Sequence, residues 1–135
     1  METVRDAMVP EPTTLVAGAS AQEAGMCLAD SDVRAIFVTE ADGRLLGVVT
    51  RKTLVREVVA AGLDPRAVTV RDVAEPPYFT LDAALGLEDG FHFLEERDLE
   101  RVPVVEKGRL VGVLSRAVVQ RRLAEDETIE DEAAL

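Results

Sequence analysis

The chain has 135 residues, with 26 Asp and Glu against 15 Lys and Arg, and its formal net charge is −11. Hydrophobic residues make up 47% of the chain and aromatic residues only 4%. This length and this apolar content exclude a wholly disordered chain and are enough for a folded core. The negative charge and the scarcity of aromatic rings argue against nucleic acid and anionic membranes as partners.

Cys27 is the single cysteine, so it has no mate for a disulfide within the chain. No run approaches the roughly 20 apolar residues that span a bilayer, and there is no cationic leader with a long apolar run. We therefore expect a soluble protein in a reducing, cytoplasmic setting, with no membrane partner.

The sequence contains an internal repeat. A shift of 66 positions lays residues 4–6 (Val-Arg-Asp) over residues 70–72. A shift of 65 positions lays GRLLGVVTR at residues 43–51 over GRLVGVLSR at residues 108–116. Two copies of about 60 residues are too few and too long for a solenoid of short repeats. The chain is therefore expected to form two small, similar lobes.

The first copy begins with a short strand and ends with a helix. Its apolar periodicity predicts strand, helix, strand, strand and helix, in that order, at residues 13–16, 20–29, 35–39, 45–49 and 50–62. Ser20, with Glu23 three residues later, forms a capping box at the start of the first helix. Gly43 supplies the positive φ of a hairpin turn, and Gly62 suits the position after the second helix. The residues expected on the buried face of that second helix are Leu54, Val55, Val58 and Val59.

The second copy follows the same β-α-β-β-α plan. Its strands and helices are expected at residues 79–81, 87–96, 101–105, 110–114 and 116–124. Gly86 and Gly90 weaken the helix at 87–96, because a glycine in a helix interior costs about 1 kcal/mol relative to alanine. The expected domain boundaries are a first repeat at 3–63, a linker at 64–69, a second repeat at 70–124 and an acidic, disordered tail at 125–135.

In both copies a hydrophobic strand and a glycine turn precede the pattern Gly-hydrophobic-hydrophobic-Thr/Ser at the start of a helix. The segments that carry it are VRAIFVTEADGRLLGVVTRKTL at 33–54 and LERVPVVEKGRLVGVLSRAVV at 99–119, with the openings VRDAMVPEPTTLV at 4–16 and VRDVAEPPYFTLD at 70–82. Their order, spacing and duplication resemble a tandem pair of cystathionine-β-synthase (CBS) domains, a Bateman module. The resemblance covers about residues 3–124.

The resemblance implies an α+β fold in which two CBS-type repeats pack sheet to sheet with pseudo-twofold symmetry and leave two clefts. It also implies a homodimer of two such modules. The usual ligands of the family are AMP, ADP, ATP or S-adenosylmethionine, which act as regulatory ligands, and no cofactor is required. The expected function is therefore a stand-alone regulatory module, not an enzyme, that binds an adenosine-type nucleotide in a cleft and signals to an unidentified partner protein.

The resemblance also assigns ligand contacts position by position. The Thr or Ser of the motif, which lies near phosphate or ribose in the family, is Thr50 in the first copy and Ser115 in the second. The Asp that follows three residues later in the family is replaced by Thr53 and Val118. A threonine hydroxyl accepts a hydrogen bond but a valine side chain does not. The second copy is therefore expected to make no hydrogen bond to a ribose hydroxyl at this position, and the first copy to make a weaker one than an Asp would.

Further ligand candidates flank the motif. Arg51 and Arg116 add positive charge at two helix starts, where backbone N–H groups favour an anion. Ile36 and Val102 are strand residues that the family geometry places at the cleft wall beside adenine. Each candidate also has an ordinary structural role: the motif hydroxyls are good helix caps, the arginines are typical helix-surface residues, and the two strand residues are typical core.

Two alternatives stay open. In the first, the clefts are vestigial and the chain is a ligand-free dimerisation or interaction module, which the two missing Asp residues favour. In the second, the chain is an enzyme. His92, the only histidine, is expected to be a partly buried structural residue, because no nucleophile with a supporting base is recognisable near it. Cys27 is expected in the core, and one His with one Cys does not make a zinc site.

Overall fold

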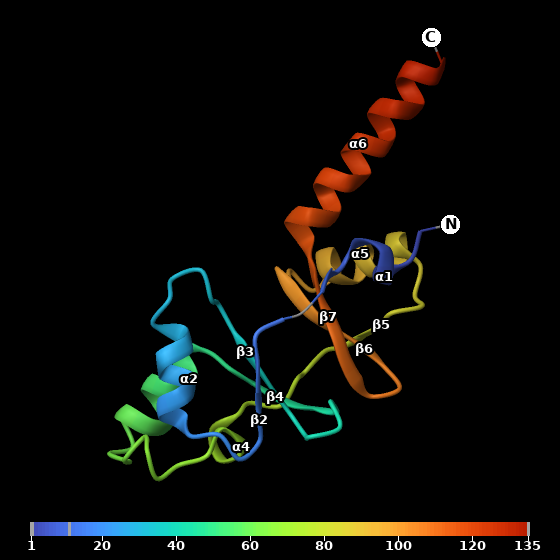
Figure 1. The fold of residues 1–135 in the computed structure, drawn as a ribbon. Coiled ribbons are helices and arrows are strands. Elements are labelled where there is room, and N and C mark those ends of the chain that lie inside the picture. Colours follow the sequence, from blue (N-terminus) through green and yellow to red (C-terminus); the bar gives the residue numbers. More distant parts are fainter. Residues whose placement is uncertain (1, 11, 135) are drawn as a thin grey trace. The chain divides into compact units, whose positions relative to one another are not determined.

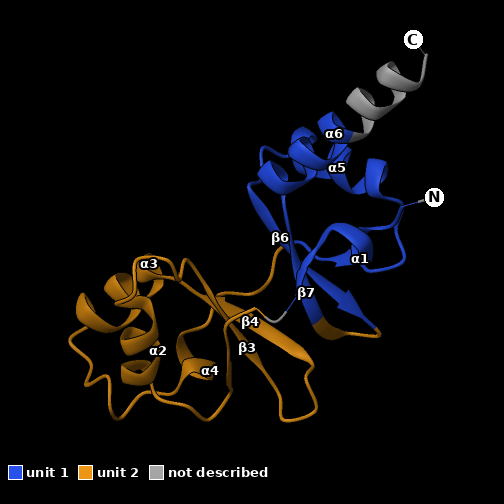
Figure 2. Ribbon diagram, turned by 45° about the horizontal axis from the view of Figure 1, so that its top comes forward, with its two compact units in different colours: residues 1–11, 79–106, 111–135 blue, residues 12–78, 107–110 orange. Residues whose placement is uncertain are grey.

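The chain folds into two compact units, each with its own sheet (Figures 1 and 2). The computed structural model describes the backbone of residues 2–10 and 12–134, and side chains in the same ranges up to residue 125. Unit 1 contains residues 1–11, 79–106 and 111–135, and unit 2 contains residues 12–78 and 107–110. None of the helices in the described ranges is long and apolar enough to cross a membrane.

Unit 2 is built on a three-stranded sheet in the order β2-β3-β4. Its strands are β2 (Thr14–Val16), β3 (Ile36–Thr39) and β4 (Leu45–Val49). β2 runs parallel to β3, and β4 runs antiparallel to β3 across the expected hairpin turn, where Gly43 has a φ of +91°. Its helical elements are α2 (Ala21–Leu28), α3 (Arg51–Leu54), the π-helical η1 (Val55–Val59) and α4 (Val70–Val73). The sheet and these helices enclose one hydrophobic core.

Unit 1 is built on a four-stranded sheet in the order β1-β7-β6-β5. Its strands are β1 (Val9–Pro10), β5 (Leu81–Asp82), β6 (Arg101–Glu106) and β7 (Arg109–Ser115), of which β7 has its first two residues in unit 2. Its helices are α1 (Val4–Ala7), α5 (Leu87–Glu96) and α6 (Arg116–Ala134). α5 packs against α1 and α6, and the residues between them and the sheet form a second hydrophobic core.

The opening segment of the first repeat lies in unit 1, whose other strands come from the second repeat (Figure 2). The N–H of Val4 donates to the carbonyl oxygen of Leu85 at 2.8 Å, and the N–H of Arg5 donates to that of Ala83 at 3.1 Å. The Arg5 guanidinium forms an ion pair with Glu106. Val4 is 0% exposed. Residues 4–7 of the first repeat thus complete the hydrophobic core that packs on the sheet of the second repeat.

The opening segment of the second repeat makes the matching contacts in unit 2. The N–H of Val70 donates to the carbonyl oxygen of Ala19 at 2.8 Å, and the N–H of Arg71 donates to that of Ala17 at 3.2 Å. The Arg71 guanidinium pairs with Glu40 at 2.7 Å. Each of these residues is the repeat equivalent of one in unit 1, so the exchange of opening segments is reciprocal.

The glycine of the repeated motif is required by this exchange. A Cβ atom on Gly47 would lie 2.6 Å from the carbonyl oxygen of Glu75, and one on Gly112 would lie 2.8 Å from the carbonyl oxygen of Val9. Both distances are shorter than non-bonded contacts of real side chains, and both partners are backbone atoms that follow an exchanged helix. Glycine at these two positions therefore allows the exchanged backbone to lie directly against the strand.

The expected α+β class and the two similar repeats are confirmed, and the elements follow the predicted order. The capping box is present, because the N–H of Glu23 donates to the Ser20 hydroxyl and the N–H of Ser20 donates to the Glu23 carboxylate, both at 3.1 Å. The helix expected at 87–96 is α5. Gly90 in that helix has a packing reason, since a Cβ there would lie 2.9 Å from a methyl group of Val4.

Two expectations about helices were wrong or incomplete. The sequence analysis missed α1 and α4, because four residues are too short to show a helical period. The expected buried face of the second helix was wrong for two of its members: Val55 is 56% exposed and Val59 is 72% exposed. Both residues lie in the π-helical turn at 55–59, whose five-residue hydrogen bonding departs from the α-helical period, and only Val58 of this turn is buried. The helix expected at 116–124 is α6, whose backbone continues to Ala134 through the tail that was expected to be disordered at 125–135. The side chains beyond Glu125 lie outside the described ranges.

The exchange predicts which unit a core substitution loosens. Val4→Ala removes two carbon atoms from the core of unit 1 and should lower the free energy of unfolding by about 2 kcal/mol. Amide hydrogen exchange should show the lost protection in residues 79–106, far along the chain from the substitution. Val70→Ala is the matched control and should loosen residues 14–49 instead. Loss of protection confined to each variant's own repeat would contradict the exchange.

Candidate functional site

In unit 2 the motif hydroxyl caps the helix that follows β4. Thr50 is the N-cap residue of α3, and its hydroxyl accepts a hydrogen bond from the N–H of Thr53 at 3.3 Å. In return the Thr53 hydroxyl accepts from the N–H of Thr50 at 3.0 Å, and the two hydroxyl oxygens lie 3.1 Å apart. This is a capping box in which threonine takes the place of the usual Glu or Gln.

The side chain of Thr53 therefore has a structural role. Its side chain is 0% exposed, and its oxygen satisfies the first backbone donor of the helix. In this arrangement its hydroxyl does not face solvent, so the acceptor expected for a ribose hydroxyl is held inside the capping box. The role of Thr53 in ligand binding stays a prediction, and its role as a cap is an observation that the sequence analysis missed.

Arg51 holds the loop between α2 and β3. Its Nη2 donates to the carbonyl oxygen of Asp30 at 2.8 Å and to that of Val33 at 2.7 Å. These carbonyls lie in the loop that follows α2, and that of Asp30 also accepts from the N–H of Val33 at 3.1 Å. The guanidinium thus fastens the loop to the start of α3, and its charge remains uncompensated by any carboxylate among the contacts described.

Arg116, the equivalent residue of unit 1, holds the corresponding loop through carboxylates. Its Nη1 donates to Oδ1 of Asp98 at 3.2 Å, and its Nη2 donates to Oε1 of Glu100. The hydrogen bond that Arg116 donates to Asp98 is the main cause that raises the pKa of Arg116 above its usual value. The sequence analysis did not identify Asp98 and Glu100, although the repeat aligns Asp98 with Asp32 of the first copy.

Ser115 ends β7 directly before α6, and its side chain is partly exposed. Among the described residues, its hydroxyl makes no hydrogen bond. Val118, in the position of the family's Asp, is also partly exposed. The two expected cleft-wall residues lie deeper, because Ile36 is buried in the core of unit 2 and Val102 in the core of unit 1. Their contact with a ligand stays a prediction.

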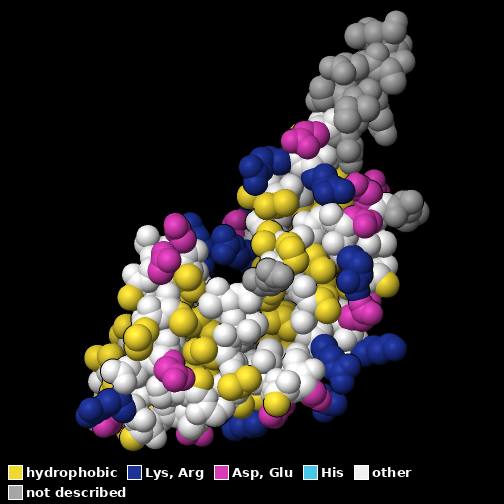
Figure 3. Space-filling model, viewed as in Figure 1, with side chains coloured by type: hydrophobic (Ala, Val, Ile, Leu, Met, Phe, Trp, Pro, Cys, Tyr) yellow, Lys and Arg dark blue, Asp and Glu magenta, His cyan; other side chains and the backbone are white. Residues whose placement is uncertain are grey.

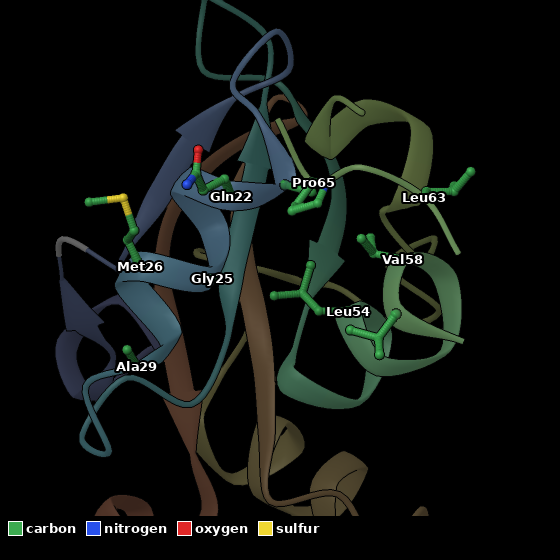
Figure 4. Close-up of a pocket in the computed structure, with 10 residues that line it drawn as sticks. Gln22, Gly25, Met26, Ala29, Leu54, Val58, Leu63 and Pro65 are labelled. Carbon is green, nitrogen blue, oxygen red and sulfur yellow. The ribbon is translucent and has the colours of Figure 1, made fainter. Parts of the chain in front are cut away.

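A separate apolar groove lies on the helical side of unit 2. It has a volume of ≈ 440 Å³ and is lined by residues of α2, α3 and η1 together with Leu63 and Pro65. Leu54 and Val58 lie between the helices, whereas Met26 extends away from them (Figure 4). Hydrophobic side chains also reach the surface over this part of unit 2 in the space-filling view (Figure 3). The groove was not predicted from the sequence, because Val59 was expected in the core and is exposed.

The two residues considered for other chemistry have ordinary surroundings. His92 lies exposed on α5, with its ring tilted against Phe91, so the expectation of a partly buried histidine was wrong. It points outward because Phe91, Phe93 and Leu94 take the inward positions of the helix. Cys27 is partly buried beside the core of unit 2.

The chain belongs to the CBS domain family, whose model matches residues 4–60 and 70–125. Hypoxic response protein 1 of Mycobacterium tuberculosis is 30% identical over 130 residues, which cover 96% of this chain and 91% of that protein. The crystal structure of Hypoxic Response Protein I with two coordinated zinc ions has a TM-score of 0.77 at 31% identity, and it covers 90% of this chain and 99% of its own. The tandem CBS pair expected from the sequence is thereby confirmed.

A second solved structure holds a nucleotide. CBSX2 from Arabidopsis thaliana, in complex with AMP, has a TM-score of 0.75 at 25% identity and covers 94% of this chain and 99% of its own. The zinc ions and the AMP belong to those two proteins. In the part of this chain that the structure describes, no three His, Cys, Asp or Glu side chains are grouped so that they could hold a metal ion.

The capping role of Thr53 is testable at one backbone amide. Thr53→Val keeps the shape of the side chain but removes the acceptor of the Thr50 N–H, so the free energy of unfolding should fall by about 1 kcal/mol and the Thr50 amide should exchange faster with solvent. Thr53→Ser is the matched variant, because it loses the methyl group but keeps the hydroxyl. It should retain slow exchange at Thr50. Equal exchange in the two variants would contradict the capping box.

Proposed function

We propose that the chain is a stand-alone regulatory CBS-pair module, with repeats at 3–63 and 70–124 joined by a linker at 64–69, that binds an adenosine-type nucleotide. The ligand class is AMP, ADP, ATP or S-adenosylmethionine. The proposal rests on one observation that both units share: a hydroxyl side chain lies at the end of a strand, directly before a helix. This residue is Thr50 in unit 2 and Ser115 in unit 1. The AMP complex of CBSX2, a protein similar over 94% of this chain, supports the ligand class.

Of the two motif ends, Ser115 is the better candidate for ligand contact. Its hydroxyl makes no hydrogen bond within the described ranges, whereas the Thr50 hydroxyl already accepts from the N–H of Thr53. Ser115 also precedes α6. The N–H of Arg116 donates to the carbonyl oxygen of Glu100, but the N–H groups that follow it in the first turn of a helix favour an anion such as phosphate. We assign Thr50, Arg51 and Thr53 to a weaker site in unit 2.

The proposed module performs no catalytic step. A ligand regulates it only if the ligand binds two arrangements of the protein with different affinities, because equal affinity leaves their populations unchanged. We propose that a partner protein in the cytoplasm responds to this shift. Isothermal titration with AMP, ADP, ATP and S-adenosylmethionine tests the proposal directly: at least one should give saturable heat and a raised melting temperature. No heat and no thermal shift with any of the four would refute it.

The valine in the position of the family's Asp predicts a gain of function. Val118→Asp adds a carboxylate that accepts from ribose hydroxyls, and a hydrogen bond to a charged group contributes about 1.5 kcal/mol. AMP should therefore bind roughly tenfold more tightly by isothermal titration. Val118→Asn is the control, since its neutral amide oxygen should give a smaller gain. Unchanged affinity in Val118→Asp would mean that ribose does not lie beside residue 118.

The apolar groove of unit 2 supports a second candidate function, that of a homodimerisation module that needs no ligand. Met26 is 70% exposed, and Val59 and Leu63, which also line the groove, are exposed as well. Large apolar side chains gathered around a groove are typical of protein–protein interfaces. We propose that a second copy of this chain covers them, with Met26 of each copy on the partner's groove, as a twofold axis requires.

If a second copy covers this groove, one charged side chain introduced there should dissociate the dimer. Met26→Glu places a carboxylate where the second copy would bury a methionine, so light scattering after size-exclusion chromatography should give the monomer mass. Tyr78→Glu is the control, because Tyr78 is exposed but does not line the groove. It should keep the dimer mass. A dimer of Met26→Glu at the same concentration would place the interface elsewhere.

A further inference from the structure

The two motif arginines have different electrostatic surroundings. The Nη2 of Arg51 bonds to two neutral carbonyl oxygens, those of Asp30 and Val33. The guanidinium of Arg116 instead pairs with the two carboxylates of Asp98 and Glu100. The charge of Arg116 is therefore already compensated, and the three groups together carry one net negative charge. The fold is the same in the two units, but the field at the start of the following helix is not.

The backbone holds both carboxylates in place. Asp98 follows the end of α5 with a φ of +51°, and its N–H donates to the carbonyl oxygen of Glu95 at 3.2 Å. Glu100 is fixed from two sides, because its carbonyl oxygen accepts from the N–H of Arg116 at 2.9 Å while its carboxylate pairs with the guanidinium. The side chain of Arg116 is only 20% exposed, whereas that of Asp98 is 92% exposed. The two acidic side chains are thus much more exposed to solvent than the arginine, since that of Glu100 is 72% exposed.

This order of charges matters to an approaching anion. A ligand phosphate near Ser115 is attracted by Arg116 but must compete with two carboxylates for the same N–H groups. It is also repelled by those carboxylates, and the repulsion grows in proportion to the charge on the ligand. A nucleoside triphosphate carries about twice the charge of a monophosphate, so the carboxylates repel it about twice as strongly.

We propose that Asp98 and Glu100 determine ligand specificity at the Ser115 end of unit 1 and select against highly charged nucleotides. The inference rests on the proposed nucleotide function and names its ligand class more narrowly: a nucleoside with at most one phosphate, in preference to a triphosphate. At the Thr50 end of unit 2, no carboxylate pairs with Arg51 in the described part of the chain, so we expect weaker selection there.

The test compares AMP with ATP in variants that differ only in charge. Asp98→Asn and Glu100→Gln are combined in one protein, and asparagine is chosen because it tolerates the positive φ at residue 98. The wild-type chain should bind AMP at least tenfold more tightly than ATP by isothermal titration. The double variant should reduce this ratio at least fivefold, chiefly by tighter ATP binding. Glu100→Gln alone should reduce it by a smaller factor and serves as the second variant if the double variant melts early.

The control removes the same number of charges from the same unit. Glu88→Gln with Asp89→Asn alters two exposed acids on the first turn of α5, neither of which forms an ion pair in the described part of the chain. This variant should leave the ratio of AMP to ATP affinity within twofold of wild type. Nucleotide binding with an unchanged ratio in the Asp98 and Glu100 variants would overturn the specificity role alone. Absence of heat with every variant would overturn the proposed function and the specificity role together.

Discussion

The packing of each repeat's opening segment onto the other repeat's sheet is the constraint on which the rest of this structure depends. A segment of four residues has no core of its own, yet Val4 and Val70 are each fully buried, one in each unit. The backbone approaches so closely that Gly47 and Gly112 have no room for a side chain. Because the exchange is reciprocal, the core of each unit includes residues from the opening segment of the other repeat.

The motif that suggests a ligand site also performs structural work. The Gly-hydrophobic-hydrophobic-Thr/Ser sequence supplies the glycine that the exchanged segment needs, the strand of the sheet and, in unit 2, the cap of the next helix. The arginine that follows it fastens the loop between a helix and a strand in both units. Repetition of the motif is therefore explained in part by the fold alone. The copies differ in Thr53 against Val118 and in carbonyls against carboxylates around the arginine, and we propose that these differences determine ligand selectivity.

The sequence was sufficient to predict elements that are long enough to show a periodic pattern or that contain a strong local signal. The capping box at Ser20, the turn at Gly43 and the ten residues of α5 all depend on contacts between near neighbours. It was not sufficient for the π-helical turn at 55–59 or for the burial of Thr53, which depend on how the helix packs on the sheet. The exchanged helices were missed because four residues are too short to show a helical period. Thr3 with Asp6 and Thr69 with Asp72 are capping pairs that give a local signal, but no local signal tells which sheet such a helix joins.

The exchange of opening segments is tested most directly by removing one of them. In a chain that lacks residues 1–10, the amide resonances of residues 79–106 should collapse into the narrow range of unfolded protein, while those of residues 14–49 stay dispersed in a ¹H–¹⁵N correlation spectrum. Addition of a peptide of residues 1–10 should restore the lost dispersion. Dispersed resonances for residues 79–106 without the peptide would show that unit 1 is complete by itself and would contradict this account of the fold.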